Sequence, residues 1–328
     1  MTSSAASPSP RNPQAPVTVI GEAVADAFVG ATAPDGSTPL TVHPGGGPAN
    51  TAVALARLGT PVRFAGRLSK GPLGTLLRER LAGSGVDLTR SVTSDRPATL
   101  ALARIDEDGG ASYDFYAEGT ADWQWTADEL TTALTAEPPS VCVHTGSLAL
   151  ALPPGGTAIE AALEHARRTA TVCVDPNVRP TVVDVALVRS RLSHWCALAD
   201  IVRVSADDVE FLMPGTGPDE AADRLLAAGA GLAVVTLGGD GALARTRDLD
   251  VRVRAPAVDV VDTIGAGDAF TAGLLHRLAA DGVLGGRLEG LTASALRDAT
   301  GFAVAVAART CAVAGAQPPY AAEMERPG

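Results

Sequence analysis

One stretch in the last third of the chain combines residues that could hold an anion and move a proton. Residues 262–270 read D-T-I-G-A-G-D-A-F, and a helical pattern runs from 268 to 280. The N–H groups that begin a helix have no internal partners, and the helix dipole is positive there. The small residues Gly265, Ala266 and Gly267 would let a phosphate approach those groups closely. The stretch therefore predicts an anion hole.

Asp268 stands at the start of that helical pattern and has two interpretations. An acidic residue is common at the beginning of a helix, where it acts as a cap. Beside an anion hole, a carboxylate can instead take the proton of an attacking hydroxyl while the hole stabilises a transferring phosphoryl group. We predict this second role, a general base. The sequence lacks the pattern G-x-x-x-x-G-K-[ST], which argues against a P-loop kinase.

A second glycine-rich segment lies early in the chain. Gly45, Gly46 and Gly47 precede a helical pattern whose first turn contains Asn50. Glycine permits close approach of the backbone to a ligand. An Asn amide both donates and accepts hydrogen bonds, which suits a ligand rich in hydroxyl groups. The alternative is a flexible loop that ends in a helix cap.

Short apolar runs alternate with helical patterns along most of the chain. Strands are predicted at residues 17–20, 61–65, 141–144, 171–174, 201–204, 232–236 and 258–262, and helices at 49–58, 75–82, 157–169, 184–199, 218–228 and 268–280. Such alternation predicts parallel strands joined by right-handed crossovers, with ligands beyond the carboxyl ends of the strands. The predicted fold class is α/β, a doubly wound and mainly parallel sheet flanked by helices.

Two segments interrupt this alternation. Residues 27–43 contain a Pro-Asp-Gly turn, and residues 98–118 contain an Asp-Glu-Asp-Gly-Gly turn, each between extended stretches. Both predict antiparallel hairpins. We interpret them as a small β lid inserted into the core, the alternative being edge strands of the main sheet. The expected organisation is a disordered tail at 1–16, one domain at 17–320 and a C-terminal tail at 321–328.

Composition narrows the class of partner. The 328 residues carry a formal net charge of −11, which argues against nucleic acid or an anionic membrane as partner. Hydrophobic residues make up 46% of the chain and aromatic residues only 4%, so the core must be built mainly from Ala, Val and Leu.

The four cysteines form no C-x-x-C pair and are expected as buried thiols in a cytoplasmic protein. The N-terminus lacks a basic region followed by an apolar stretch, and no run reaches 18 apolar residues, so neither a secretory signal nor a membrane span is expected.

The two glycine-rich segments together resemble the hallmark motifs of the ribokinase-like sugar kinases, also called the phosphofructokinase-B family. The pattern D-T-x-G-A-G-D-x-F is complete at 262–270, and G-G-x-x-x-N-x-A is present at 45–52 with one extra glycine. Residues 21–26, 236–242 and 315–316 are similar to the family's first strand with its sugar-binding aspartate, its nucleotide-binding turn and its C-terminal turn. The resemblance covers nearly the whole chain after the tail.

The resemblance implies an ATP-dependent enzyme that transfers the γ-phosphate to a sugar hydroxyl, on a doubly wound α/β core with a β lid. Asp268 would be the base, with the N–H groups of Gly265, Ala266 and Gly267 forming the anion hole. The residues that would bind sugar hydroxyls are Asp26, Gly46, Gly47 and Asn50. Those that would contact ATP are Ser205, Thr236, Gly238 and Gly241.

The resemblance also implies metal ions. Mg²⁺ would accompany ATP near Asp208, and K⁺ would bind near Asp262. One segment departs from the family pattern of a Lys followed by Asn-x-x-Glu, because residues 203–208 read R-V-S-A-D-D. Ser205 stands at the Asn position and Asp208 at the Glu position. Aspartate is one methylene shorter than glutamate, so we expect weaker metal binding than is usual in the family.

The substrate is narrowed by residues 175–180, D-P-N-V-R-P, which resemble the D-x-N-x-R element of the fructokinase and ketodeoxygluconate kinase branches. Arg179 would then contact a phosphate or a substrate carboxylate. The alternative is a turn with a surface arginine. Residues 113–116 and 121–122 are also fructokinase-like, whereas core packing is expected for Trp123 and Trp125.

Fructose is therefore the expected substrate, with 2-keto-3-deoxygluconate second. A nucleoside comes third, because we identify no aromatic pair to stack on a base. A catalytically silent sugar-binding regulator on the same fold is the alternative from another class. The family also suggests a homodimer formed through lid strands.

Overall fold

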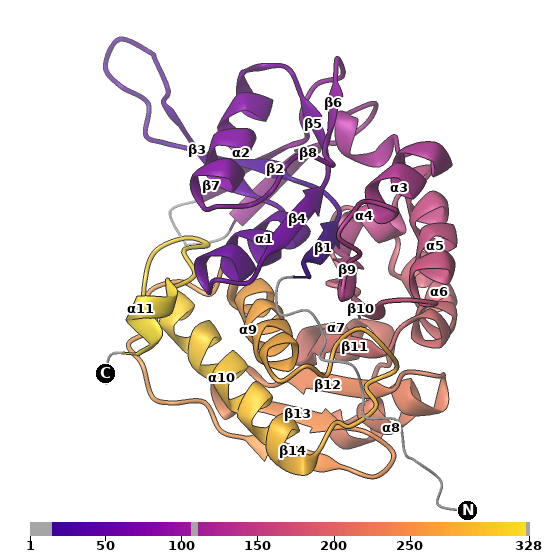
Figure 1. The fold of residues 1–328 in the computed structure, drawn as a ribbon. Coiled ribbons are helices and arrows are strands. Elements are labelled where there is room, and N and C mark those ends of the chain that lie inside the picture. The colour runs from indigo at the N-terminus through magenta and orange to yellow at the C-terminus, as the bar shows by residue number, and fades with distance from the viewer. Residues whose placement is uncertain (1–14, 106–110, 326–328) are drawn as a thin grey trace, which may run out of the picture.

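A single large sheet organises the molecule. The computed structural model describes residues 15–105 and 111–325, so most of the expected N-terminal tail and the end of the C-terminal tail lie outside the described residues. The eight strands lie in the order β14-β13-β12-β11-β10-β9-β1-β4 (Figure 1). Their bounds are β4 (Val62–Ala65), β1 (Val17–Ile20), β9 (Cys142–Gly146), β10 (Thr171–Asp175), β11 (Ile201–Ser205), β12 (Leu232–Thr236), β13 (Ala242–Arg245) and β14 (Asp250–Val253). The strands from β4 to β12 run parallel, and β13 and β14 complete one edge in antiparallel pairing.

Helices cover both faces of this sheet, which explains why its strands are apolar almost without interruption. Along β1, Val17 and Val19 pack into one core, and Ile20 packs into the other. The helices of the first core are α1 (Gly47–Arg57), α2 (Pro72–Gly83), α9 (Ala266–Ala280) and α10 (Ala293–Cys311). The helices of the second core are α3 (Ala127–Leu134), α4 (Ser147–Ala151), α5 (Gly155–Ala166), α6 (Val185–Leu198), α7 (Ala206–Leu212) and α8 (Pro218–Ala227).

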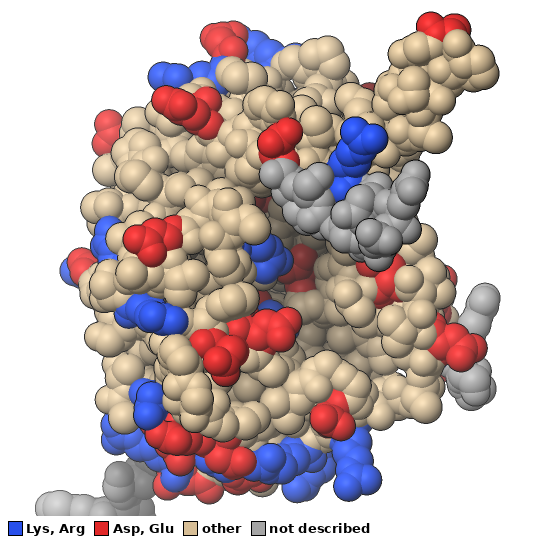
Figure 2. Space-filling view, turned by 180° about the vertical axis from the view of Figure 1, so that it is seen from behind, with Lys and Arg blue, Asp and Glu red and all other residues tan. Residues whose placement is uncertain are grey.

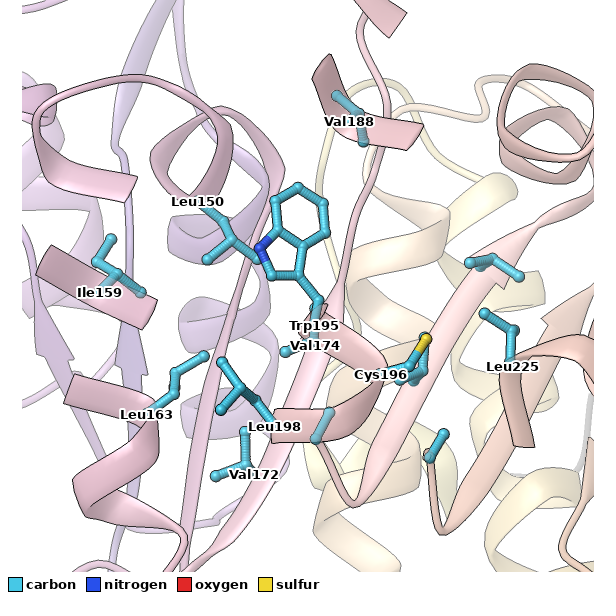
Figure 3. Packing of buried hydrophobic residues seen from close by; sticks show 14 of the residues in the cluster. Leu150, Ile159, Leu163, Val172, Val174, Val188, Trp195, Cys196, Leu198 and Leu225 are labelled. Atoms are coloured by element: carbon cyan, nitrogen blue, oxygen red, sulfur yellow. The ribbon is translucent and has the colours of Figure 1, made fainter. Parts of the chain in front are cut away.

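The second core is centred on Trp195, one of the largest fully buried side chains. Figure 3 shows its indole ring between Leu150 and Val188, with β10 residue Val174 below it. The indole N–H of Trp195 donates 2.7 Å to Glu160, so this buried polar group is satisfied. Trp123 and Trp125 are also buried in this core, as expected.

The strand order fixes where a ligand can bind. The chain proceeds from β1 to β4 in one direction across the sheet, and from β9 through β10, β11 and β12 in the other. The connections therefore diverge between β1 and β9, and the carboxyl ends of these strands form a topological switch point. The expected doubly wound, mainly parallel fold is confirmed.

The two predicted hairpins build a separate sheet in the order β3-β2-β7-β8. Its strands are β2 (Val24–Val29), β3 (Leu40–Gly45), β7 (Leu100–Ile105) and β8 (Ala111–Tyr116). The predicted turn at 106–110 lies outside the described residues. These strands are not edge strands of the main sheet, so that alternative is wrong. A small parallel pair, β5 (Arg67–Ser69) and β6 (Val92–Ser94), stands beside them.

Two buried carboxyl groups lie where the chain passes from the large sheet to the smaller one. Glu22, between β1 and β2, accepts a hydrogen bond from the N–H of Ala149 at 3.0 Å. Asp122 accepts one from the N–H of Ala23 at 3.1 Å and one from the hydroxyl of Thr99 at 2.6 Å. Burial raises the pKa of Glu22 to about 7 and that of Asp122 to about 6. These two groups tie the smaller sheet to the core.

The predicted strand at 258–262 is wrong. The segment forms no strand, and the N–H groups of Val261 and Asp262 instead donate to the carbonyl of Cys311 at the end of α10. Val260 is 64% exposed, so the apolar run does not mark a buried strand. An apolar run by itself does not show what covers it, and here it lies on the surface.

The end of the chain packs back on its beginning. The short helix α11 (Ala321–Met324) follows Tyr320, and Met324 packs beside Leu58 at the end of α1. Figure 1 shows α11 close to α1 and α10. Within the described residues, no helix combines the length and apolar character needed to cross a membrane.

Candidate active site

The glycine-rich motif at 262–270 forms the N-terminus of α9. Gly265 is the N-cap with φ 76°, a left-handed conformation that glycine adopts without strain. The N–H of Ala266 donates 3.2 Å to the carbonyl of Thr263. Within the described residues, the N–H groups of Gly265 and Gly267 donate to no protein acceptor. Two of the three N–H groups predicted to form an anion hole are therefore free to donate to a ligand.

Asp268 lies in the first turn of α9 and is partly buried. The side-chain amide of Asn50 in α1 donates to its Oδ2 at 3.0 Å. Burial and Asp175 raise the pKa of Asp268, the Asn50 bond and the cations Arg179 and Arg203 lower it, and the resulting pKa is about 6. A carboxylate with this pKa is ionised at neutral pH and can still accept a proton.

Each of the three glycines at 45–47 makes room for a different neighbour. A Cβ on Gly45 would lie 2.0 Å from Oδ2 of Asp26, and one on Gly46 would lie 2.8 Å from the carbonyl of Glu22. A Cβ on Gly47 would lie 3.3 Å from Oδ1 of Asp268. The glycines thus bring the backbone at the start of α1 against Asp26 and Asp268.

Asp26 is close enough to Arg179 for the guanidinium to act on its pKa. Asp26 is in β2, where its register partner is His43 of β3. Burial raises the pKa of Asp26 to about 6, although His43 and Arg179 both lower it. Arg179 acts on Asp268 as well, so one exposed guanidinium influences both carboxylates.

Asn177 and Ser147, to which the sequence analysis assigned no role, also lie close to Gly47. A Cβ on Gly47 would lie 2.8 Å from the amide nitrogen of Asn177 and 3.6 Å from Cβ of Ser147. Asn177 follows β10 and Ser147 follows β9, and both have positive φ, 42° and 56°. Their positions just after the carboxyl ends of two neighbouring parallel strands are the signal that could have identified them.

A buried ion pair lies against Gly267, in the first turn of α9. Arg203 of β11 donates 2.9 Å to Oδ2 of Asp175 and 2.6 Å to the hydroxyl of Thr236. A Cβ on Gly267 would lie 2.8 Å from both terminal nitrogens of Arg203. The pairing was not predicted, because it depends on how β10, β11 and β12 lie side by side.

Ser205 and Asp208 form the capping box of α7. Oδ2 of Asp208 accepts from the N–H and hydroxyl of Ser205 at 2.8 and 2.7 Å, and Oδ1 accepts from Val178 at 2.7 Å. Asp208 is 3% exposed. Within the described part of the chain, no group of three or more His, Cys, Asp or Glu residues could form a protein metal cage.

The remaining predicted residues, Gly238, Gly241 and Asp262, lie in turns and loops. Gly241, with φ 96°, makes the turn from β12 to β13, where a Cβ would lie 1.9 Å from the carbonyl of Val253. Gly238 is exposed in the same turn. Asp262 accepts hydrogen bonds from Ile264 at 3.0 Å and from Gly315 at 2.8 Å, which joins two loops beside α9.

The view from behind shows a hollow near the middle of the molecule, with acidic and basic side chains at its edge (Figure 2). A ligand bearing both hydroxyl and phosphate groups needs acceptors as well as positive charge. The class that these features define is a small-molecule kinase of the α/β type.

Comparison with known proteins specifies the family. The model of the pfkB family of carbohydrate kinases matches residues 15–323, and the chain belongs to this family. This confirms the resemblance based on the two glycine-rich motifs, and with it the expectation of a sugar kinase.

Relatives with assigned activities are similar over most of the chain. The fructokinase of Rhizobium leguminosarum bv. trifolii is 35% identical over 263 residues, 78% of each chain. A fructokinase structure from Vibrio cholerae O395 with fructose, ADP and calcium has a TM-score of 0.78 at 28% identity, covering 93% of this chain and 95% of that one. An aminoimidazole riboside kinase from Salmonella enterica, complexed with aminoimidazole riboside and an ATP analog, has a TM-score of 0.76 at 27% identity, covering 94% and 98%.

Proposed function

We propose that this protein is an ATP-dependent fructokinase. One observation carries the chemistry, the 3.0 Å bond from Asn50 to Asp268 beside the glycine-lined N-terminus of α9. It supports a site in which Asn50 binds sugar hydroxyls and Asp268 is the base, next to the proposed anion hole. The similarity to the fructokinases of R. leguminosarum and V. cholerae supports fructose as the acceptor.

In the proposed mechanism, Asp26, Asn50 and the backbone at Gly46 and Gly47 hold the sugar. Asp268 accepts the proton of the attacking hydroxyl as that oxygen bonds to the γ-phosphorus of ATP and the bond to the bridging β,γ-oxygen breaks. The N–H groups at the start of α9 stabilise the negative charge on the transferring group.

ATP would lie over the carboxyl ends of β11 and β12, near Ser205, Thr236, Gly238 and Gly241. The exposed apolar side chains of Val260, Val261 and Val313 offer a surface for its base. Mg²⁺ supplies positive charge to the phosphates when bound, and Asp208 would hold it through water. Asp262, between two loops, is the proposed neighbour of K⁺.

We also propose that residues 17–320 form one kinase domain, in which the smaller sheet acts as the lid, through segments 27–43 and 98–118. The lid would close over bound sugar and exclude water, which would otherwise accept the phosphate. A cytoplasmic location and a homodimer formed through the smaller sheet complete the proposal.

Arg179 favours a second candidate. Its positive charge acts on both Asp26 and Asp268, so its guanidinium would be a partner for the carboxylate of 2-keto-3-deoxygluconate. A nucleoside kinase is a third candidate, on the similarity to the aminoimidazole riboside kinase. A catalytically silent regulator is disfavoured, because the base and the anion-hole donors are both present.

ATP consumption with a panel of acceptors tests the proposal. The panel includes fructose, 2-keto-3-deoxygluconate and a purine nucleoside, each assayed with Mg²⁺ and again after chelation by EDTA. We expect the highest kcat/KM with fructose, loss of turnover in EDTA, and recovery when Mg²⁺ is restored. If none of the acceptors in the panel supports ATP consumption, the silent regulator is favoured.

The variant Arg179→Gln separates the two sugar candidates. If fructose is the substrate, the variant does not selectively lose affinity for the acid sugar. A wild-type preference for 2-keto-3-deoxygluconate that disappears in Arg179→Gln would overturn the fructokinase assignment and leave the kinase proposal intact.

A further inference from the structure

The ends of three neighbouring strands are joined by one arginine. Arg203 of β11 bonds to Asp175 at the end of β10 and to Thr236 at the end of β12. The side chains of Arg203 and Asp175 are only 7% and 6% exposed. Thr271, in the second turn of α9, also lies 3.4 Å from Oδ2 of Asp175. The pair thus connects the sheet to the helix that carries the proposed base.

The guanidinium is in close contact with the first turn of that helix. Both of its terminal nitrogens lie 2.8 Å from the position that a Cβ on Gly267 would occupy. Gly267 immediately precedes Asp268 and provides one of the two available anion-hole donors. A shift of Arg203 would therefore move, or release, the residues proposed to perform the transfer.

The location is unfavourable for a purely structural ion pair. Burial lowers the pKa of Arg203, but Asp175, Asp208 and Asp268 outweigh burial and raise it, so the side chain is charged. A cation at the positive end of a helix dipole gains nothing from the dipole. Nε of Arg203 and Oδ1 of Asp175 are buried without a hydrogen-bond partner among the described residues. Buried charges and unsatisfied polar atoms lower the stability of the fold. Such features are found mainly at functional sites.

We propose that Arg203 is a positioning residue for phosphoryl transfer. Held by Asp175 and Thr236, it fixes the first turn of α9, and it adds positive charge beneath the anion hole. The inference rests on the proposed roles of Asp268 and the anion hole.

The test compares Arg203→Met, Arg203→Lys and the control Arg63→Met. Arg63 is a good match because its side chain is also 7% exposed, and its partners, Asp87 at 3.7 Å and the carbonyls of residues 136–138, include no proposed site residue. Each variant is characterised by kcat, KM for sugar, the pH profile of kcat/KM and thermal stability.

We expect Arg203→Met to lower kcat by roughly 10–100-fold with little change in KM for sugar, since small displacements at a reacting centre cost about that much. The charged groups acting on Asp268 are Asp175, Arg179 and Arg203, and its α1 neighbour Asn50 is neutral. Removing one cation raises the pKa of Asp268, so the acidic limb of kcat/KM moves to higher pH. Arg203→Lys retains the charge and should leave that limb in place, with a smaller loss of kcat. Arg63→Met should lose stability only.

Folded Arg203→Met with wild-type kcat and an unmoved limb would overturn the inference. If that variant does not fold, Asp175→Asn tests the same contact, because it loosens the guanidinium while conserving side-chain shape. Wild-type behaviour of Asp175→Asn would then overturn it. Asp268→Asn separates a failure of the Arg203 inference from a failure of the proposed mechanism. Full turnover in Asp268→Asn would refute the mechanism itself.

Discussion

At the scale of single residues, the proposed site depends on the carboxylate of Asp268, whose pKa is raised by some of its neighbours and lowered by others. Burial and Asp175 favour the protonated form of Asp268, whereas Asn50, Arg179 and Arg203 favour the ionised form. The pKa of about 6 that results lies just below neutral pH. A general base works best when its pKa is near the operating pH, because it is then ionised and still basic.

Replacing Asp268 by Asn conserves its shape and removes the proton acceptor. We expect kcat to fall by roughly 10²–10⁴-fold, the usual effect of losing general-base catalysis. In the wild type, the base is lost as the pH falls through about 6, so kcat/KM should decline there, and the residual activity of the variant should lack this limb. Steady-state kinetics between pH 5 and 8 provide the measurement. Near-normal turnover by Asp268→Asn would exclude it as the base.

A substitution of Gly45, which packs against Asp26, tests the proposed sugar pocket. Gly45→Ala should displace the Asp26 carboxylate, because the new Cβ would lie 2.0 Å from Oδ2. We expect this variant and Asp26→Ala to raise KM for the sugar roughly 5–100-fold, since buried hydroxyl contacts are lost. Gly83→Ala is the control, because a Cβ there meets nothing within 4 Å. Isothermal calorimetry should show that ATP binding is nearly unchanged, and equal weakening of both ligands would show that the pocket is misplaced.

At the scale of elements, helices α9 and α10 pack closely through glycine. A Cβ on Gly273 of α9 would lie 2.9 Å from Cα of Ala303 in α10, whereas a Cβ on Gly301 of α10 would meet nothing within 4 Å. The first glycine is required by packing. The second contributes only backbone freedom, which disfavours a helix.

Substituting alanine at these two positions should therefore have opposite effects. Gly301→Ala should raise the free energy of unfolding by about 0.5–1 kcal/mol, through helix propensity. Gly273→Ala should lower it by about 1–3 kcal/mol, through overpacking. Urea denaturation measures both. Effects of the same sign would mean that α9 and α10 are not packed as described.

Alternation of apolar runs and helical patterns predicted β1, β4 and β9 to β12 correctly, because a covered parallel strand is apolar throughout. The same signal failed at 258–262, where the apolar side chains face outward. The motifs identified Asp268 and Asn50, which are 218 residues apart in sequence. The pairing of Arg203 with Asp175 could not be predicted, since it requires knowing which strands are neighbours and how they are aligned.

At the scale of the whole molecule, two sheets are connected through Glu22 and Asp122. Burial raises the pKa of both acids, so both bind a proton more tightly in the folded state than in the unfolded state. Their contribution to stability is complete below the unfolded pKa, near 4, and is lost as the pH rises through about 6 to 7. The junction between the sheets is therefore weakest under alkaline conditions.

Glu22→Gln should make stability less dependent on pH, because glutamine keeps the shape and never becomes charged. We expect the wild type to lose about 1–3 kcal/mol of unfolding free energy from this group between pH 5 and 8, and the variant to lose less. Glu164→Gln, at an exposed position of α5, is the control. Denaturation at several pH values gives the comparison, and identical slopes for wild type and Glu22→Gln would contradict the assignment.

The separation of Asn50 and Asp268 along the chain also has a consequence during synthesis. At about 5–20 residues per second, roughly 10–40 s pass between the appearance of Asn50 and that of Asp268. A growing chain thus has the proposed sugar ligands long before it has the base and the anion hole. On the proposed mechanism, catalytic competence can therefore arise only after residue 268 has been added and has met Asn50.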